Sequence, residues 1–394
     1  MRILHINEHS LTKGGAEAYL FDLIKRLEIR GHACYLAYAK EEPDFDISSI
    51  RLPSIGQVSA INLERDLASL QSFINKVCPD LIHIHGIWNI EVIEACLKLK
   101  PCLMTGHDYR WLCPDSKFYW KRTQSPCSRA PGWLCAPSSL KHKCVTLRPH
   151  LLTRNIQRIQ RFKRLIPEIR AVVTASRYVA NRFRASSFPE AKTHIIPYYC
   201  SFNPLDSPRK LPKEKSISII GRTADYKGID YFLSSLGKLP ADVRGFIMGD
   251  INEKKERSIL EMARTAHCEG RVTLENWSDR KGVARLLKKT SILIFPSIWP
   301  EPFGITGIEA MAFGIPVIGS DIGGIPDWVD HGVTGYLCHP KSSEEIAAYA
   351  TKLFSDQDLM ITMGIGGQES IRDKFLPEIH LKKLEQVYAS CLQD

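Results

Sequence analysis

The sequence predicts an α/β protein built on two parallel β-sheets, each with helices on both faces. Short apolar runs alternate with amphipathic helical segments along nearly all 394 residues, which is typical of buried parallel strands joined by helical crossovers. The chain is too long for one ordinary hydrophobic core. A segment rich in proline and charge, residues 201–215, divides the alternation into two halves. We therefore expect two doubly wound domains joined by a linker.

The first half, residues 1–200, contains six expected strands. They are the apolar runs Arg2–Asn7, Ala33–Ala37, Asp80–His85, Cys102–His107, Ala171–Ala175 and Thr193–Ile196. A cysteine-rich stretch at residues 112–147 interrupts the alternation and is too long to lack structure without a cause. We treat it as an insert in the first domain.

The second half, residues 216–375, resumes the same alternation. Its expected strands are Ser216–Ile220, Arg244–Met248, Val272–Glu275, Ile292–Phe295 and Pro316–Gly319. The last segment, residues 376–394, predicts one helix over about Leu376–Cys391. In open parallel sheets, ligands bind beyond the carboxyl ends of the strands, so the residues that follow these strands are the candidates for a site.

The composition is that of a soluble globular protein, with 44% apolar and 24% charged residues. No window of about 18 uninterrupted apolar residues occurs. Met1 leads directly into a strand without a signal-peptide pattern. We therefore expect a cytoplasmic protein whose twelve cysteines are mostly thiols.

Most of the net charge of +10 is concentrated in one stretch. Residues 141–170 contain nine Lys or Arg and the single acid Glu168. Arg154, Arg158 and Arg161 share one face of the helix predicted there, opposite an apolar face. Such a helix can lie on the anionic inner face of a membrane. Alternatively, it can pack against another element with its arginines facing water or an acceptor phosphate.

The most chemically informative segment is Pro296–Leu337. Two carboxylates, Glu301 and Glu309, flank a glycine turn between a buried strand and a helix. At the positive start of that helix a diphosphate can bind the unpaired backbone amides of Gly304, Ile305 and Thr306. The two carboxylates can accept hydrogen bonds from sugar and ribose hydroxyls. The segment therefore predicts a site for a sugar nucleotide.

Three motifs resemble those of glycosyltransferase family 4, the retaining enzymes of the GT-B fold. They are GGAEAYLFDLIKRLEIRGH (residues 14–32), GRTADYKGIDYFL (221–233), and the run of EAMAFGIPVIGS, GGIP and HGVTGYL (309–337). The resemblance implies the GT-B architecture, with two Rossmann-like domains facing a central cleft. Residues 1–200 would bind the acceptor and residues 216–375 the nucleotide sugar, and the last helix would cross back to the first domain.

The resemblance also implies which residues hold the donor. Arg222 and Lys227 match the family cations that neutralise the departing diphosphate. Glu309 matches the glutamate that holds the ribose, and Glu301 the one beside the donor sugar. Because these cations and the helix start can stabilise the diphosphate, we expect no metal and no cofactor besides the NDP-sugar substrate.

In the first domain the resemblance points to a glycine pair and a histidine. Gly14 and Gly15 lack side chains, so backbone amides can approach the phosphate or the acceptor. His107 would lie beside the donor sugar, where its carbonyl and imidazole can position the reacting ring, and Asp108 could orient that imidazole. The expected catalytic set is therefore His107, Glu301, Arg222 and Lys227.

The insert has two interpretations. Four thiolates could hold zinc or a cluster, and the insert supplies Cys113, Cys127, Cys135 and Cys144. The spacing lacks a C-x2-C pair, which favours the alternative, a packed loop that binds the acceptor. Aromatic residues such as Trp111 and Trp120 could stack on sugars or lie at a membrane interface.

These observations predict a retaining, metal-independent glycosyltransferase that moves a sugar from an NDP-sugar to a glycan or lipid-linked acceptor in cell-surface polysaccharide biosynthesis. It would be cytoplasmic, with peripheral attachment to the inner face of the membrane as one option. A synthase of the sucrose or trehalose type is the alternative among enzymes. A basic nucleic-acid-binding protein is the alternative of another class. The chain lacks RNP, zinc-finger and helix-turn-helix signatures, so we expect no nucleic-acid partner.

Overall fold

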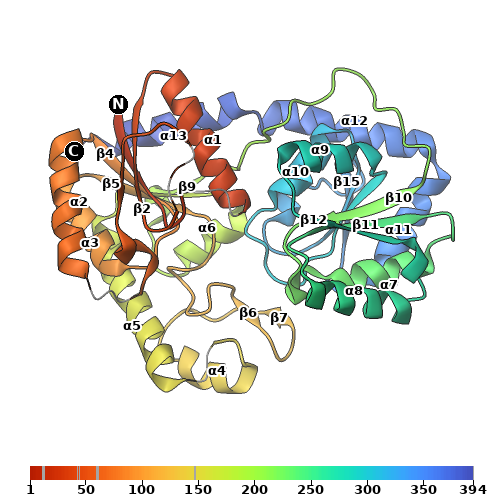
Figure 1. Ribbon diagram of the computed structural model, residues 1–394, viewed down its shortest axis with the longest axis horizontal. Coiled ribbons are helices and arrows are strands. Elements are labelled where there is room, and N and C mark those ends of the chain that lie inside the picture. The colour runs from red at the N-terminus through yellow and green to blue at the C-terminus, as the bar shows by residue number, and fades with distance from the viewer. Residues whose placement is uncertain (11–13, 42, 44, 59–61, 146–147, 394) are drawn as a thin grey trace. The chain divides into compact units, whose positions relative to one another are not determined.

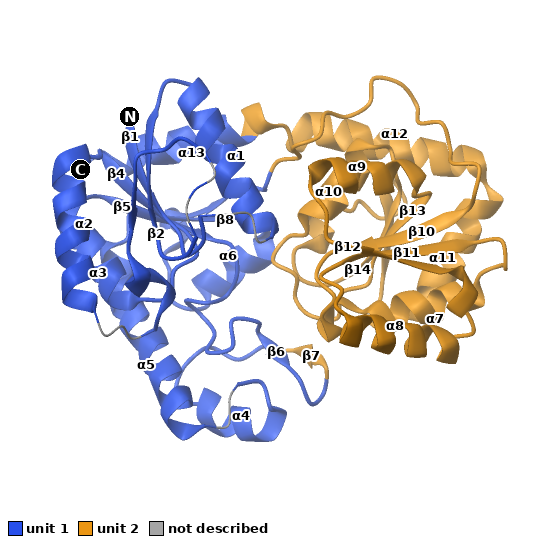
Figure 2. Cartoon of the chain, in the orientation of Figure 1, with its two compact units in different colours: residues 1–123, 127–198, 380–394 blue, residues 124–126, 199–379 orange. Residues whose placement is uncertain are grey.

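The computed structural model describes residues 1–10, 14–41, 43, 45–58, 62–145 and 148–393 (Figure 1). The chain divides into two compact units (Figure 2). Unit 1 comprises Met1–Thr123, Cys127–Tyr198 and His380–Asp394, and unit 2 comprises Gln124–Pro126 and Tyr199–Ile379. Each unit contains its own parallel β-sheet.

Unit 1 is built around a seven-stranded sheet in the order β3-β2-β1-β4-β5-β8-β9, in which all neighbouring strands are parallel. The strands are β1 (Arg2–Ile6), β2 (Ala33–Tyr38), β3 (Ser49–Arg51), β4 (Leu81–Ile84), β5 (Cys102–Gly106), β8 (Ala171–Thr174) and β9 (Thr193–Ile195). All six expected strands are present, and β3 is an additional edge strand. Every residue of β4, β5 and β8 is buried, as expected for strands covered on both faces.

The helices of unit 1 include one that comes from the end of the chain. They are α1 (Gly15–Ile29), α2 (Leu63–Val77), α3 (Ile90–Leu99), α5 (Pro149–Leu165), α6 (Arg177–Arg184) and α13 (Pro377–Cys391). From His380 onward, α13 belongs to unit 1. The Tyr388 hydroxyl lies 2.8 Å from His83 Nδ1, and Glu385 accepts two hydrogen bonds from the guanidinium of Arg30. These polar contacts tie α13 to the sheet and to α1.

Unit 2 has a six-stranded parallel sheet in the order β12-β11-β10-β13-β14-β15. The strands are β10 (Ser216–Ile220), β11 (Arg244–Gly249), β12 (Val272–Asn276), β13 (Ile292–Phe295), β14 (Val317–Ser320) and β15 (Gly335–Cys338). The helices are α7 (Ile229–Lys238), α8 (Glu253–Thr265), α9 (Arg280–Lys289), α10 (Ile305–Ala312), α11 (Ser343–Ser355) and α12 (Gln357–Lys374). The five expected strands are present, so the predicted fold class, two Rossmann-like parallel sheets, is confirmed.

The insert has little regular structure. It contains β6 (Tyr119–Trp120), β7 (Ser125–Pro126) and α4 (Cys135–His142). Residues 146 and 147, at its end, lie outside the described residues. Nowhere in the described chain is a helix both long enough and apolar enough to span a membrane.

Candidate active site

Three loops at the carboxyl ends of neighbouring strands in unit 2 pack tightly against one another. They follow β10, β13 and β14. Gly228 (φ +76°) ends the first loop, and a Cβ atom there would lie 2.0 Å from the carbonyl oxygen of Pro296 in the second. Gly323 (φ +63°) lies in the third loop, where a Cβ atom would lie 2.4 Å from the backbone of Glu301. Both positions therefore require glycine, which explains the second glycine of GRTADYKG and the first glycine of GGIP.

Glu301 is buried among these loops, and its two carboxylate oxygens differ. The Oε2 atom accepts hydrogen bonds from Lys227 Nζ at 2.6 Å, Trp299 Nε1 at 2.9 Å and Ser297 Oγ at 3.2 Å. The Oε1 atom accepts none from the residues that the structure describes. One oxygen thus fixes the carboxylate, and the other can accept a hydrogen bond from a ligand hydroxyl.

Lys227 is held by aromatic rings as well as by Glu301. Its Nζ lies 5.5 Å from the ring centroid of Trp299 and 5.9 Å from that of Phe295. The ring of Tyr226 lies 4.9 Å from that of Trp299. Sequence reasoning missed Ser297 and Trp299, although both lie within four residues of Glu301 in the stretch SIWPE.

Arg222 lies in the loop after β10 and is exposed to solvent. The next residue anchors this loop, because the Thr223 amide donates to Asp250 Oδ1 at 2.6 Å and the Thr223 hydroxyl donates to the Asp250 carbonyl at 2.9 Å. Asp250 follows β11, the strand adjacent to β10. The backbone beside Arg222 is therefore fixed while its guanidinium is accessible to an anion.

The start of α10 and Glu309 belong to the same short helix. Gly304 (φ +104°) precedes it, and the backbone amides of Ile305 and Thr306 lie in its first turn, where an α-helix offers no internal acceptor. Glu309 lies one turn further on and is partly exposed. Burial raises the pKa of its carboxyl to about 7, and the charge of Arg280 opposes that rise.

In unit 1, His107 follows β5 and belongs to a row of hydrogen-bonded rings. His5 Nδ1 lies 3.1 Å from His85 Nε2, and His85 Nδ1 lies 3.0 Å from His107 Nε2. His107 Nδ1 lies 2.5 Å from the Tyr198 hydroxyl. Burial lowers the pKa of His5 and of His107 to about 3, and it lowers the pKa of His85 well below its usual range. The three imidazoles are therefore neutral at physiological pH.

The surroundings of His5, at one end of this row, determine which ring nitrogens donate and which accept. His5 Nε2 is buried and has no partner among the described residues, and an unpaired lone pair is less costly than an unpaired N–H. The proton of His5 therefore lies on Nδ1, and His85 and His107 also donate from Nδ1. Both ring nitrogens of His107 are used inside unit 1. Its backbone carbonyl, which accepts no hydrogen bond from the described residues, is the polar group left for a ligand.

The expectation that Asp108 orients the His107 ring is wrong. The Asp108 carboxylate pairs with Arg110, which donates from Nη2 to Oδ2 at 2.7 Å and from its backbone amide to Oδ1 at 2.8 Å. Arg110 also lies 3.7 Å from Glu8. His85 and Tyr198 hold the His107 ring instead. The alternation of His83 and His85 along a strand was the one feature of the sequence that pointed to this contact between His85 and His107.

Three histidines of unit 1 have the spacing of a metal site. Among the described residues, His5, His83 and His85 form the one group whose ligand atoms all lie within 4.8 Å of one another. A metal does not fit this group, because His83 contacts the Tyr388 hydroxyl at 2.8 Å and the Thr105 hydroxyl at 2.6 Å with its two nitrogens. We interpret the group as part of the hydrogen-bonded core.

The glycine pair lies at the start of α1. Gly14 is buried immediately before this 15-residue helix, and Gly15 is its exposed first residue. The N-terminus of a helix favours an anion. Residues 11–13, which precede the pair, lie outside the described residues.

The structure corrects the expectation of a fully exposed arginine face on α5. Arg154 is exposed, but Arg158 is buried and donates a hydrogen bond to the carbonyl of Arg110. Arg161 forms ion pairs with Glu91 and Glu94 of α3. Two of the three arginines therefore hold α5 against unit 1 and are not available to a membrane.

Trp111 was also expected at an acceptor or membrane surface, and this expectation is wrong. Its ring is buried and stacks on Phe162 with a centroid distance of 5.8 Å, and Nε1 donates to the Ile87 carbonyl at 3.1 Å. Trp120 is partly buried in the insert and stacks on His142 with a centroid distance of 4.1 Å.

Two family models match the chain, one in each unit. The model for Glycosyltransferase Family 4 matches residues 13–198, and that for Glycosyl transferases group 1 matches residues 205–369. The chain belongs to glycosyltransferase family 4. The resemblance inferred from the three motifs is therefore confirmed.

Two curated relatives match parts of this family 4 chain. It is 36% identical over 137 residues to the N-acetyl-alpha-D-glucosaminyl L-malate synthase of Bacillus anthracis, covering 35% of each chain. It is 27% identical over 184 residues to the capsular polysaccharide biosynthesis glycosyltransferase CapM of Staphylococcus aureus, covering 45% of this chain and 47% of CapM. The chain thus spans less than half the length of these relatives.

A solved structure matches over nearly the full length. The Anabaena protein HepE in complex with UDP has a TM-score of 0.73 to this family 4 chain at 17% sequence identity, covering 99% of this chain and 100% of that one. At this level of identity the likeness shows a shared fold.

Proposed function

We propose that the chain is a retaining, metal-independent glycosyltransferase that moves a sugar from a nucleoside diphosphate sugar to a glycan or lipid-linked acceptor in polysaccharide biosynthesis. The observation that carries the proposal is the buried Glu301, with Oε2 held by Lys227, Trp299 and Ser297 and with Oε1 open to a ligand hydroxyl. Family membership supports glycosyl transfer and the retaining outcome. The relation to CapM supports a polysaccharide product, and the fold shared with UDP-bound HepE supports a nucleotide donor.

The donor would bind to unit 2 through its diphosphate, its ribose and its sugar. The amides at the start of α10 and the exposed Arg222 would bind the diphosphate. Glu309 would accept hydrogen bonds from the ribose, and Glu301 Oε1 one from the sugar. As the bond between the anomeric carbon and the phosphate oxygen breaks, its electron pair passes to the diphosphate, whose growing charge Arg222 and Lys227 would stabilise.

Unit 1 would contribute groups beside the reacting sugar and the acceptor. The His107 carbonyl would accept a hydrogen bond from a sugar hydroxyl, since both imidazole nitrogens are already engaged. The amides after Gly14 and Gly15, at the positive end of α1, would bind a phosphate or the acceptor.

The proposal is tested by NDP release from purified protein with a panel of UDP- and GDP-sugars. Soluble sugars and polyprenyl-linked sugars would be offered as acceptors, with and without chelator. We expect one donor to be turned over equally well in both conditions and the product to keep the donor's anomeric configuration by NMR. Absence of NDP binding throughout the panel, or strict recovery of activity by magnesium after chelation, would contradict the proposal.

We also propose that the insert, rather than α5, makes a peripheral contact with an anionic membrane. Trp133, Leu134 and Leu140 are exposed by 58%, 68% and 68%. Exposed cations lie close to them in sequence, including Lys141 and Lys143. Apolar side chains beside cations are typical of surfaces that bind anionic lipid.

A further inference from the structure

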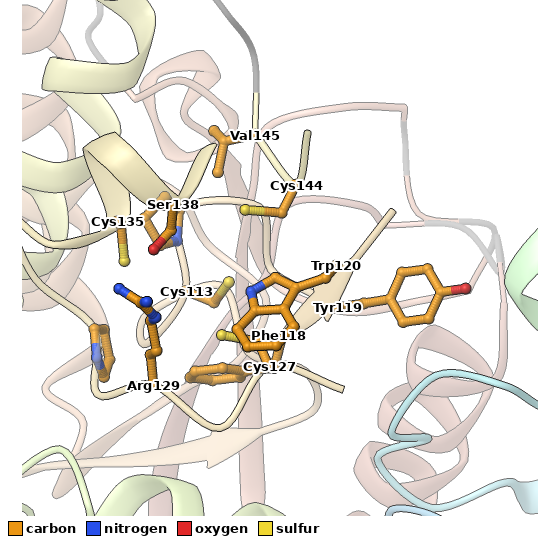
Figure 3. A pocket seen from close by; sticks show the side chains of 12 residues that line it. Cys113, Phe118, Tyr119, Trp120, Cys127, Arg129, Cys135, Ser138, Cys144 and Val145 are labelled. Carbon is orange, nitrogen blue, oxygen red and sulfur yellow. The ribbon is translucent and has the colours of Figure 1, made fainter. Parts of the chain in front are cut away.

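Four cysteines of the insert line one small pocket. Cys113, Cys127, Cys135 and Cys144 all belong to its wall, and Figure 3 shows their sulfur atoms directed toward the same space. The cavity has a volume of about 30 Å³, enough for roughly one water molecule or one ion. The cysteines come from separate points of the insert: the loop after β5, the residue after β7, the start of α4 and the segment after α4.

The insert has little regular structure and is held to helices α5 and α6 by a few contacts, among them Lys163 Nζ to the Pro131 carbonyl and Arg182 to the Arg129 carbonyl. Its regular structure consists of two two-residue strands and one eight-residue helix, and three of its large apolar side chains are exposed. Segments of about 40 residues or fewer rarely fold on a hydrophobic core and usually need disulfides or a metal. All four cysteines are free thiols in this structure.

Burial raises the pKa of the Cys113, Cys127 and Cys144 thiols, so their thiolate forms depend on positive charge nearby. Arg129 also lines the pocket, and its cation would offset the negative charge that four thiolates leave on a divalent ion.

We propose that Cys113, Cys127, Cys135 and Cys144 bind one zinc ion in a structural tetrathiolate site that holds the insert together. Four cysteine ligands are a standard set for structural zinc, with Zn–S distances of about 2.3 Å. No three of the sulfur atoms lie within 4.8 Å of one another in this structure, so binding would draw them inward. Iron–sulfur clusters also take four thiolates, so the metal analysis must distinguish zinc from iron with labile sulfide.

The proposal is tested by elemental analysis of the full-length protein purified without added metal. We expect about one zinc per chain in the wild type, and little or none in Cys127→Ser and in Cys144→Ser. Cys78→Ser is the matched control, because Cys78 is an exposed cysteine outside the insert, and it should keep its zinc. X-ray absorption of the wild type should show four sulfur neighbours at about 2.3 Å.

The wild type also offers a test that does not depend on the folding of a variant. Titration of its thiols with a mercurial should release zinc, detected with a chromophoric chelator, in a single step. Zinc-free protein that takes up none from a zinc buffer, iron with labile sulfide, or disulfides among these four cysteines would each overturn the assignment. NDP binding by unit 2 is independent of this site, so failure of the zinc proposal is distinguishable from failure of the proposed function.

Discussion

Lys227 and Glu301 form a largely buried ion pair, with Nζ 2.6 Å from Oε2 and side chains that are 18% and 10% exposed. The pair links the loop after β10 to the loop after β13, so it contributes to the geometry of both. Removing one partner of a buried pair leaves the other charge unpaired, which commonly costs about 3–5 kcal/mol. The same lysine would therefore affect both stability and catalysis.

This double role separates Lys227 from Arg222. We expect Lys227→Ala and Arg222→Ala each to lower kcat by about 100-fold or more, as the loss of one preorganised stabiliser commonly does. Only Lys227→Ala should also lower the melting temperature, because Arg222 is exposed and has no salt bridge in the described structure. Thermal unfolding beside steady-state rates checks both points. Equal melting temperatures would show that the ion pair contributes nothing to stability.

NDP affinity should depend on pH through Glu309. Its pKa is raised to about 7 by burial, and ribose hydroxyls would bind its charged form, so a proton competes with the nucleotide. Affinity should be greatest above pH 7 and should fall below it, by at most about tenfold per pH unit. Calorimetry of NDP binding between pH 5.5 and 8 measures this dependence. Glu309→Gln is the control and should leave only the pH dependence of the NDP's own terminal phosphate, whose pKa is about 6, and a wild-type dependence no larger than that of the variant would exclude this carboxylate from the nucleotide site.

His107→Ala should produce a kinetic defect with nearly normal nucleotide affinity. The substitution removes a ring that His85 and Tyr198 hold in place, so the loop carrying the His107 carbonyl loses its support. We expect kcat at saturating donor to fall more than tenfold, about 1.4 kcal/mol or more. A near-normal kcat would leave His107 a structural residue.

Asp108→Asn is the companion variant. Because Asp108 pairs with Arg110 and not with His107, we expect a lower melting temperature and little change in kcat. A kcat defect like that of His107→Ala, without loss of stability, would restore the orienting role that the sequence suggested.

Membrane binding should depend on the exposed apolar side chains of the insert. Replacing Trp133, Leu134 and Leu140 together with Ser should reduce co-sedimentation with vesicles containing phosphatidylglycerol while leaving NDP affinity unchanged. Arg154→Gln, on the exposed part of α5, is the matched control and should have a smaller effect, about one cation's contribution of ~1 kcal/mol. Unchanged binding by the triple variant would remove the insert from the membrane interface.

Much of the architecture can be predicted from the sequence alone. Strands buried on both faces must be apolar along their whole length, so runs such as Ile292–Phe295 and Ala171–Ala175 could be located without a structure. Gly228 and Gly323 are also recognisable in the sequence, because they adopt backbone conformations that other residues rarely tolerate, although the backbone that each one approaches belongs to another loop. Family membership followed from these local patterns.

The surroundings of the site residues depend on contacts between distant parts of the chain. Helical periodicity placed Arg154, Arg158 and Arg161 on one face, but it could not show that α3 and the loop before the insert cover two of them. His5 and His85 are 80 residues apart and meet only because β1 and β4 are neighbouring strands. The four cysteines of the insert lack a short-range spacing and share a pocket only after the loops fold. Local sequence specifies backbone conformation and burial periodicity, whereas the identity of each buried partner is set by packing across the fold.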